Sequence, residues 1–420
     1  MKQRSAILCC LCCLASAQAG ADGIDWAFNG HAKYRVDLVS YPDDSVFREA
    51  LGSSSFDNGL ETRLRFSGRS GGWDLQADYQ LIGLYGDTLE LSESLPGALF
   101  PLGQIINDDR RWFDLTWTIA DSSKGALVHR LDRLSIGHTT DNTVWRFGRQ
   151  AISWGNGLVF NPMDIFNPFD PAAVDKEYKS GDDMLYGQYL FANGSDLQGV
   201  GVVRRDPVTG EVEQDQSSFA FKYHGFIGMN EFDLLAAEHY DDRVLGAGGS
   251  MDLSGAVLRG DVTWTETDTQ DVFSAVASLS YSWIWGEKNV SGLFEYYYNG
   301  FGQSGGDYAP ESLALNPDLL RRVERGEVFT LARHYLAASA TIEMSPLFML
   351  IPNVFFNIED PSALFQLVAQ YDWKQNLQVL GAVNLPIGAS GTEYGGIETP
   401  VEGLYFSTGP SLFAQLAFYF

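Results

Sequence analysis

The sequence predicts an all-β fold, a transmembrane antiparallel β-barrel of roughly 16 strands, within a range of about 14 to 18. Three observations lead to this prediction. Polar and apolar residues alternate along many long segments, no apolar run after the N-terminal region is long enough for a membrane-spanning helix, and the chain stops inside an alternating segment. The strand number follows from about 400 mature residues at about 22 to 27 residues per strand with its share of loops.

The alternation is clearest in residues 60–69 and 73–81, where every charged side chain falls on one face of a strand. Residues 70–72, Ser-Gly-Gly, connect the two segments as a tight hairpin. The same pattern recurs at 33–38, 113–119, 219–224, 258–264, 273–281, 290–298, 335–343, 364–372, 377–383 and 412–420. A soluble β-sandwich also alternates, but its strands are usually about five or six residues long, whereas about nine to eleven cross a bilayer. Charges in mid-strand favour a wet lumen.

The N-terminal region has the three parts of a secretory signal peptide. Lys2 and Arg4 form the basic start, residues 7–14 the apolar stretch, and residues 17–19 the small-residue cleavage site. We therefore assign 1–21 to the signal peptide and 22–420 to a single barrel domain. All four cysteines lie in the signal peptide, so the mature chain has no thiol for a disulfide, a metal or catalysis.

The last strand, 412–420, ends on the aromatic residue Phe420. It resembles the C-terminal signature of bacterial outer-membrane barrels, in which a terminal aromatic is recognised by the barrel-assembly machinery. The resemblance implies a location in the outer membrane of a Gram-negative bacterium and makes Phe420 the contact with that machinery.

The chain is strongly acidic. Its net charge of -26 becomes -28 once Lys2 and Arg4 leave with the signal peptide. This charge argues against a nucleic-acid partner. Acidic external loops would instead let divalent cations bridge the protein to lipopolysaccharide.

Four segments interrupt the alternation and predict long loops: 40–58, 85–110, 151–183 and 299–333. The third contains two Asn-Pro pairs and an Asp-Pro, which force turns, and aromatic residues between them that are costly to leave in water. We expect 151–183 to pack against the lumen wall as a constriction or plug.

This segment also carries a family resemblance. The motif Gly-Arg-Gln-x-x-x-Trp-Gly at 148–155 is followed by Asn-Pro-x-Asp-x-x-Asn-Pro at 161–168. It resembles a group of proteobacterial outer-membrane barrels defined by a domain of unknown function and, more distantly, porin and alginate-export barrels. The resemblance covers about forty residues; it implies a barrel that passes small solutes and names no substrate. A purely structural role for Arg149 and Trp154 as loop anchors stays open.

Strand parity selects the side chains that face the lumen. Half of the basic residues of the mature chain precede residue 150, which predicts one wall more positive than the other and a transverse field across the pore. The alternative is a filled barrel in which these charges pair with one another. The candidate lumen and constriction residues are Arg63, Arg65, Arg69, Asp74, Asp78, Arg146, Arg149, Trp154, Asp164, Asp170, Arg259 and Asp261.

We expect a channel for diffusion or uptake of small hydrophilic solutes. The alternatives are a closed barrel with a structural or assembly role and a barrel enzyme acting on lipid or peptide. Among six histidines the best cluster with acids is at 239–242, and a solvated turn explains this cluster better than a catalytic site does. No phosphate-binding or dinucleotide motif is present, so we expect no enzyme, cofactor or metal. The oligomeric state stays open.

Overall fold

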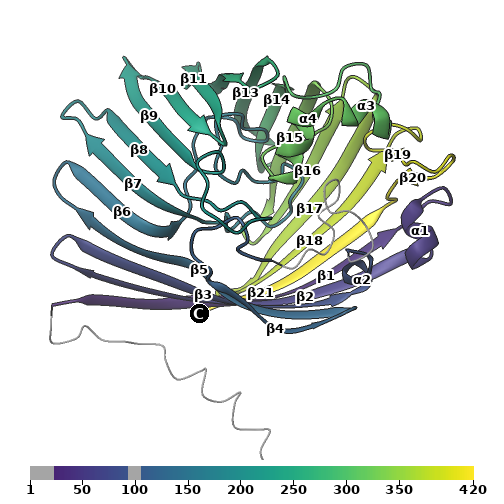
Figure 1. Ribbon diagram of the computed structural model, residues 1–420, viewed down its shortest axis with the longest axis horizontal. Coiled ribbons are helices and arrows are strands. Elements are labelled where there is room, and N and C mark those ends of the chain that lie inside the picture. The colour runs from purple at the N-terminus through teal and green to yellow at the C-terminus, as the bar shows by residue number, and fades with distance from the viewer. Residues whose placement is uncertain (1–22, 93–105) are drawn as a thin grey trace, which may run out of the picture.

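The chain forms one closed antiparallel barrel. The computed structural model describes residues 23–92 and 106–420, so the predicted signal peptide lies outside the described residues. Each strand pairs with its neighbours along the chain, and the barrel closes where β1 (Asp25–Ser40) pairs with β21 (Ser411–Tyr419) (Figure 1). Closure leaves no sheet edge between the first and last strands, as a bilayer requires.

Within the described residues, eighteen strands make up the barrel. They are β1, β2 (Ser54–Ser70), β3 (Trp73–Gly86), β5 (Gly125–Thr139), β6 (Thr143–Gln150), β7 (Asp182–Leu190), β8 (Asp196–Val202), β9 (Ser218–Ile227), β10 (Asn230–His239), β11 (Asp242–Leu253), β12 (Ala256–Glu266), β13 (Asp271–Trp285), β14 (Lys288–Tyr298), β15 (His334–Ser345), β16 (Phe348–Asn357), β17 (Ser362–Lys374), β18 (Leu377–Ile387) and β21.

This number is the top of the predicted range and exceeds the sixteen expected. The estimate assumed one average length per strand, whereas β6, β7 and β8 have only 8, 9 and 7 residues. The predicted hairpin at 70–72 is confirmed, since Ser70 pairs with Trp73. The first predicted loop, 40–58, was too long, because β2 already begins at Ser54.

The short strand β4 (Thr116–Ser122) stands outside the eighteen. It pairs with the first half of β5, on the edge that β6 uses in the second half. Compared with β1 to β3, which have 14 to 17 residues, the wall formed by β6 to β8 is low. The segment before β4 lies at this low wall, where the backbone of Arg111 forms an isolated antiparallel β-bridge with the backbone of Arg204.

The alternating pattern places apolar side chains outside and polar ones inside. On β2 and β3, Leu60 and Phe66 are exposed, whereas Arg63, Asp78 and Gln80 are buried in the lumen. A water-soluble barrel would show the reverse. Five of the six exposed tryptophans among the described residues lie toward the short-turn ends of strands, as interfacial aromatic residues do; they are Trp73, Trp145, Trp283, Trp285 and Trp373.

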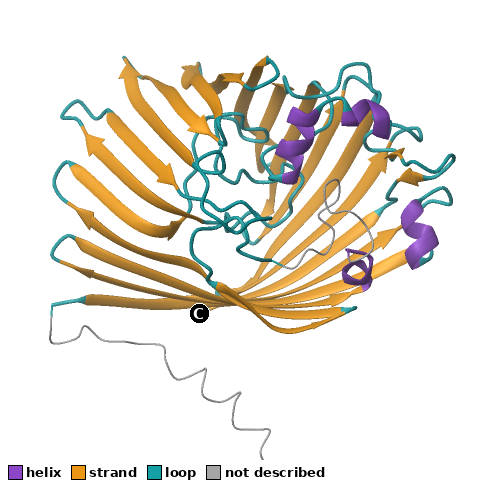
Figure 2. Cartoon of the chain, viewed as in Figure 1, coloured by secondary structure: helices purple, strands orange, loops and turns teal. Residues whose placement is uncertain are grey.

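The two ends of the barrel differ. Tight turns connect strands at one end, which we call the short-turn end, and longer connections gather at the other, the long-loop end (Figure 2). The long-loop end carries α1 (Val46–Leu51), α2 (Asp87–Ser92), α3 (Pro310–Ala314), α4 (Pro317–Glu324) and the small hairpin β19 (Ile397–Glu398) with β20 (Tyr405–Phe406). Among the described residues, no helix is long and apolar enough to cross a membrane.

The carboxylate of Glu393 connects the loop at 388–410 to the loop at 299–333 and to the ends of β15 and β16. It accepts hydrogen bonds from Leu331 N at 2.8 Å, Asn357 Nδ2 at 2.7 Å and Tyr335 Oη at 2.5 Å. Its own backbone N–H donates to Asp360 at 2.6 Å. Removal of the carboxylate from water raises the pKa of Glu393 to about 7.

Raising the pH from 6 to 8 is therefore expected to loosen the loop at 388–410. A carboxyl whose folded pKa lies above its ordinary 4.5 stabilises the fold fully below 4.5, and this stabilisation is lost as pH rises through about 7. Hydrogen exchange, corrected for its intrinsic pH dependence, should be faster in this loop at pH 8. Glu393→Gln is the control, and an equal pH response in that variant would contradict the assignment. Asp360 and the phenols of Tyr308, Tyr335 and Tyr394 also face this group.

Candidate functional site

Residues 151–181, between β6 and β7, fold into the interior of the barrel and are called the plug (Figures 1 and 2). The chain leaves the wall after Gln150, the last residue of β6. Two residues earlier, Gly148 has a φ of 118°, in the region that favours glycine. A Cβ there would lie 2.2 Å from the carbonyl oxygen of Leu134. Gly155, with φ 89°, makes the next turn, where a Cβ would lie 2.0 Å from Asn161 Oδ1. The glycines of the Gly-Arg-Gln and Trp-Gly motifs are therefore required by the backbone path.

One face of the plug is apolar and packs on the barrel wall. Trp154, Met163 and Phe166 form a buried cluster with inward-facing residues of β7 to β11, among them Val200 and Leu235. The indole of Trp154 also donates to Gln198 on β8 at 2.8 Å. The aromatic residues of the Asn-Pro segment thus leave water by covering an apolar patch inside the lumen.

Two carboxylates of the wall hold the plug backbone. Glu295 on β14, fully buried, accepts the N–H groups of Leu158 at 2.9 Å, Val159 at 3.2 Å and Phe160 at 2.6 Å. Asp261 on β12 accepts those of Asn156 at 2.6 Å and Gly157 at 3.2 Å. These carboxylates satisfy the donors of an irregular segment that has no sheet partner.

The C-terminal part of the plug is held by a lysine on another part of the barrel wall. Lys33 on β1 lies 2.6 Å from both Asp175 and Glu177. Burial alone would raise the pKa of Glu177, but the hydrogen bond and charge of Lys33 hold that pKa below its ordinary value. Gln415 on β21 donates to Asp175 at 3.0 Å, and the phenol of Tyr419 donates to Glu177 at 2.9 Å. The plug is therefore attached to opposite sides of the barrel.

Inside the plug, Lys179 and Asp164 form a buried ion pair at 2.6 Å. Lys179 also donates to the carbonyl oxygen of Ile152 at 2.7 Å, so it joins the first and last parts of the loop. Burial raises the pKa of Asp164 and lowers that of Lys179. The pair therefore helps to fix the loop conformation.

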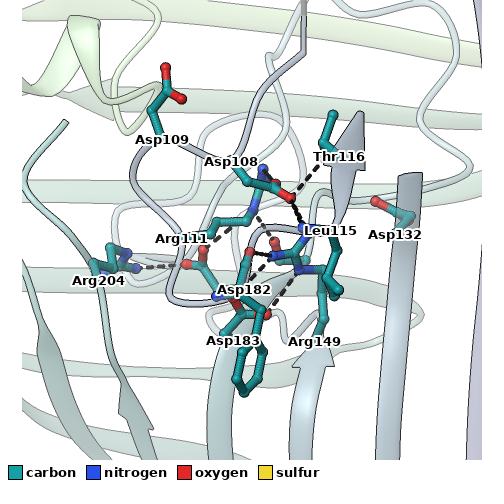
Figure 3. Close-up of polar contacts among 12 residues, drawn as sticks. Asp108, Asp109, Arg111, Leu115, Thr116, Asp132, Arg149, Asp182, Asp183 and Arg204 are labelled. Atoms are coloured by element: carbon teal, nitrogen blue, oxygen red, sulfur yellow. Dashed lines mark hydrogen bonds and ion pairs between the residues drawn. The ribbon is translucent and has the colours of Figure 1, made fainter. Parts of the chain in front are cut away.

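Arg149 of the Gly-Arg-Gln motif lies in a buried ion network where the plug begins and ends (Figure 3). It donates to Asp183 through Nε at 2.9 Å and Nη2 at 3.0 Å, and to Asp108 through Nη1 at 2.8 Å. Burial alone would raise the pKa of Asp108, but Arg149 and Arg111 keep that pKa low. Asp182 binds Arg204 at 2.7 Å. The network joins the low wall of β6 to β8 to the segment that precedes β4.

A polar cavity of about 780 Å³ remains between the plug and the wall of β1, β2, β3 and β5. Outside the plug it is lined by five cations and three carboxylates: Lys33, Arg35, Arg63, Arg111, Arg130, Asp37, Glu61 and Asp132. A second cavity of about 260 Å³ shares Asn384 with the first and extends to the last long loop. Among the charged residues that line the larger cavity, basic residues thus outnumber acidic ones.

Some of the sequence-predicted lumen residues meet in mid-barrel. Arg63 lies 2.5 Å from Asp132, and Arg65 lies 3.4 Å from Asp78. Arg63 lines the large cavity. Near the short-turn end, Arg146 lies 3.5 Å from Asp74, and Arg69 is exposed at the end of β2.

The other predicted residues lie in or under the plug or apart from it. Arg149, Trp154, Asp164 and Asp261 are the anchors described above, while Asp170 accepts the N–H of Ala172 at 2.8 Å within the loop. On the same strand as Asp261, Arg259 donates to Ser280 at 2.9 Å.

Several contributors to the site are absent from the sequence-based candidates, among them Lys33, Tyr178 and Asp108. Lys33 was assigned only to a strand face, Tyr178 only to a loop, and Asp108 to an irregular segment without any signal. Two acids and an aromatic at 175–178, in a loop opposite a basic wall, were the available hint for the first two.

Of the comparisons with known proteins, the one with solved structures bears on this architecture. No family model matches the chain, and no curated protein matches its sequence. A BenF-like porin from Pseudomonas fluorescens Pf-5 is similar in structure, with a TM-score of 0.53 and 10% identity over 94% of this chain and 98% of that chain. A triple mutant of Rhodopseudomonas blastica porin has a TM-score of 0.46 and 10% identity over 94% of this chain and 100% of its own. Together with the strand pairing, the first likeness shows the fold: a closed antiparallel barrel of eighteen strands, of the architecture found in porins.

Proposed function

We propose that this protein is an outer-membrane channel of a Gram-negative bacterium through which small hydrophilic solutes diffuse. The observation that carries the proposal is the cavity of about 780 Å³, lined by charged side chains inside a barrel whose outer face is apolar. A charged lumen favours polar solutes over apolar ones. The proposed path enters at the long-loop end, passes Asn384 from the smaller cavity into the larger, and leaves at the short-turn end.

The wall charges support a preference for anions. On the opposite wall, the carboxylates of Asp261 and Glu295 already accept hydrogen bonds from backbone N–H groups of the plug. Lys33, Arg35 and Arg63 line the free space. A solute in the cavity therefore meets net positive charge.

Purified mature protein in planar bilayers is expected to give stepwise ion currents in KCl, with anions more permeant than cations. The physical reason is the excess of cations over carboxylates along the cavity. Single-channel recording and the reversal potential in a salt gradient measure both quantities. Folding is checked by the heat-dependent shift in electrophoretic mobility of the barrel. A folded barrel without current would favour the closed structural barrel and would sink the channel proposal.

A further inference from the structure

The plug places an aromatic ring and two carboxylates directly on the basic wall. The ring centroid of Tyr178 lies 4.2 Å from the Arg63 guanidinium carbon, 5.4 Å from that of Arg65 and 5.6 Å from Lys33 Nζ. The ring of His31 lies 5.1 Å away, and Arg65 donates to the phenol oxygen at 3.4 Å. Such distances are those of cation–π contacts.

The adjacent carboxylates complete this arrangement. Asp175 and Glu177 both bind Lys33, within three residues of the ring. Burial raises the pKa of the Tyr178 phenol, so the ring is neutral at pH 7 and the negative charge belongs to the two acids. Residues 175–178 thus present to the wall what an anionic aromatic molecule would present: a flat ring with a carboxylate near it.

One cation of this wall has a hydrogen-bond donor without an acceptor. Arg63 Nε is buried and has no hydrogen-bond partner among the described residues, its ion-pair distance to Glu61 being 3.7 Å. Arg63 also lines the cavity of about 780 Å³, which leaves room for a molecule beside the plug. A buried guanidinium N–H without an acceptor is costly, and an acceptor arriving from the cavity would relieve that cost.

We propose that the wall formed by Lys33, Arg63 and Arg65 is a binding site for small aromatic carboxylates, and that residues 175–178 occupy it as an internal competitor. The inference rests on the proposed channel function and deepens it by naming a solute class. A solute ring stacks on the guanidinium groups and its carboxylate pairs with Arg63 or Lys33, displacing Tyr178.

Equilibrium binding to the detergent-solubilised full-length barrel tests the site without requiring conduction. The probe is 4-hydroxyphenylacetate, with acetate (charge without ring) and tyramine (ring with opposite charge) as comparisons. Calorimetric titration is expected to show saturable binding of 4-hydroxyphenylacetate alone. Equal binding of acetate, or no binding of any of the three, would overturn the proposal.

Variants separate competition from a structural role of the ring. Tyr178→Ala is expected to tighten binding by at least about threefold, since the competitor is gone, and Arg65→Gln to weaken it by at least about threefold. Arg243→Gln makes the same charge change on β11, where the exposed Arg243 pairs with Glu266 at 3.1 Å, and is expected to leave binding unchanged. If Tyr178→Ala bound the probe no better than the unaltered protein, the internal competitor would be refuted.

The two proposals fail in distinguishable ways. Ion current in bilayers without selective binding would remove the solute class and leave the channel. Selective binding to a folded barrel that carries no current would remove the channel proposal, and with it the role of the site in transport.

Discussion

Glu295→Ala is expected to release the plug and raise single-channel conductance several-fold, with larger current fluctuations. The substitution removes the acceptor of the Leu158, Val159 and Phe160 N–H groups in a fully buried place. Each buried donor left without a partner costs about 1–3 kcal/mol, so detachment of this stretch becomes favourable. The barrel strands keep their own hydrogen bonds, and the mobility shift of the folded protein should be retained.

A matched control for this experiment is Glu343→Ala. Glu343 is exposed near the short-turn end and accepts a hydrogen bond from Asn289 at 2.7 Å. Its removal is expected to leave conductance unchanged. If Glu295→Ala conducted like the unaltered protein, the packing of Phe160 against Tyr297 and Tyr335 would suffice to hold the plug. The carboxylate would then be no determinant of the constriction.

Arg149→Ala is expected to destabilise the barrel more than any surface charge change. Removing one partner of a buried ion pair typically costs about 3–5 kcal/mol, because the opposite charges stay buried without compensation. Here Asp108 and Asp183 would both lose their shared cation. We expect the urea concentration at the midpoint of unfolding to fall markedly. The heat-dependent mobility shift monitors the unfolding.

Two further variants make this prediction specific. Arg149→Lys should rescue little, because an ammonium group cannot reproduce the two-pronged contact with Asp183. Arg243→Ala breaks an exposed pair with Glu266 at 3.1 Å and should cost about 0–1 kcal/mol. An Arg149→Ala midpoint as close to the unaltered value as that of Arg243→Ala would show that the network does not secure the low wall.

The position of Arg149 also explains the limits of the lumen prediction. Parity correctly assigns side chains to the inner face, because period two is a property of the strand itself. It does not distinguish a residue that faces water from one that a loop covers. Arg149 and Asp261 lie under the plug, and even Arg63, which lines the cavity, is covered on one side by Tyr178 of the plug.

The alternation of residues by itself determined the fold class, the hairpin at 70–72 and the inward assignment of charges such as Arg63. These properties are local, set by side-chain direction along a strand and by the demand that lipid meet apolar atoms. Only the tertiary structure decided that eighteen strands close the barrel, that Glu295 and Lys33 hold the plug from opposite sides, and that Tyr178 sits among cations. Those contacts join residues more than a hundred positions apart, and a local pattern carries no information about which distant partner closes such a contact.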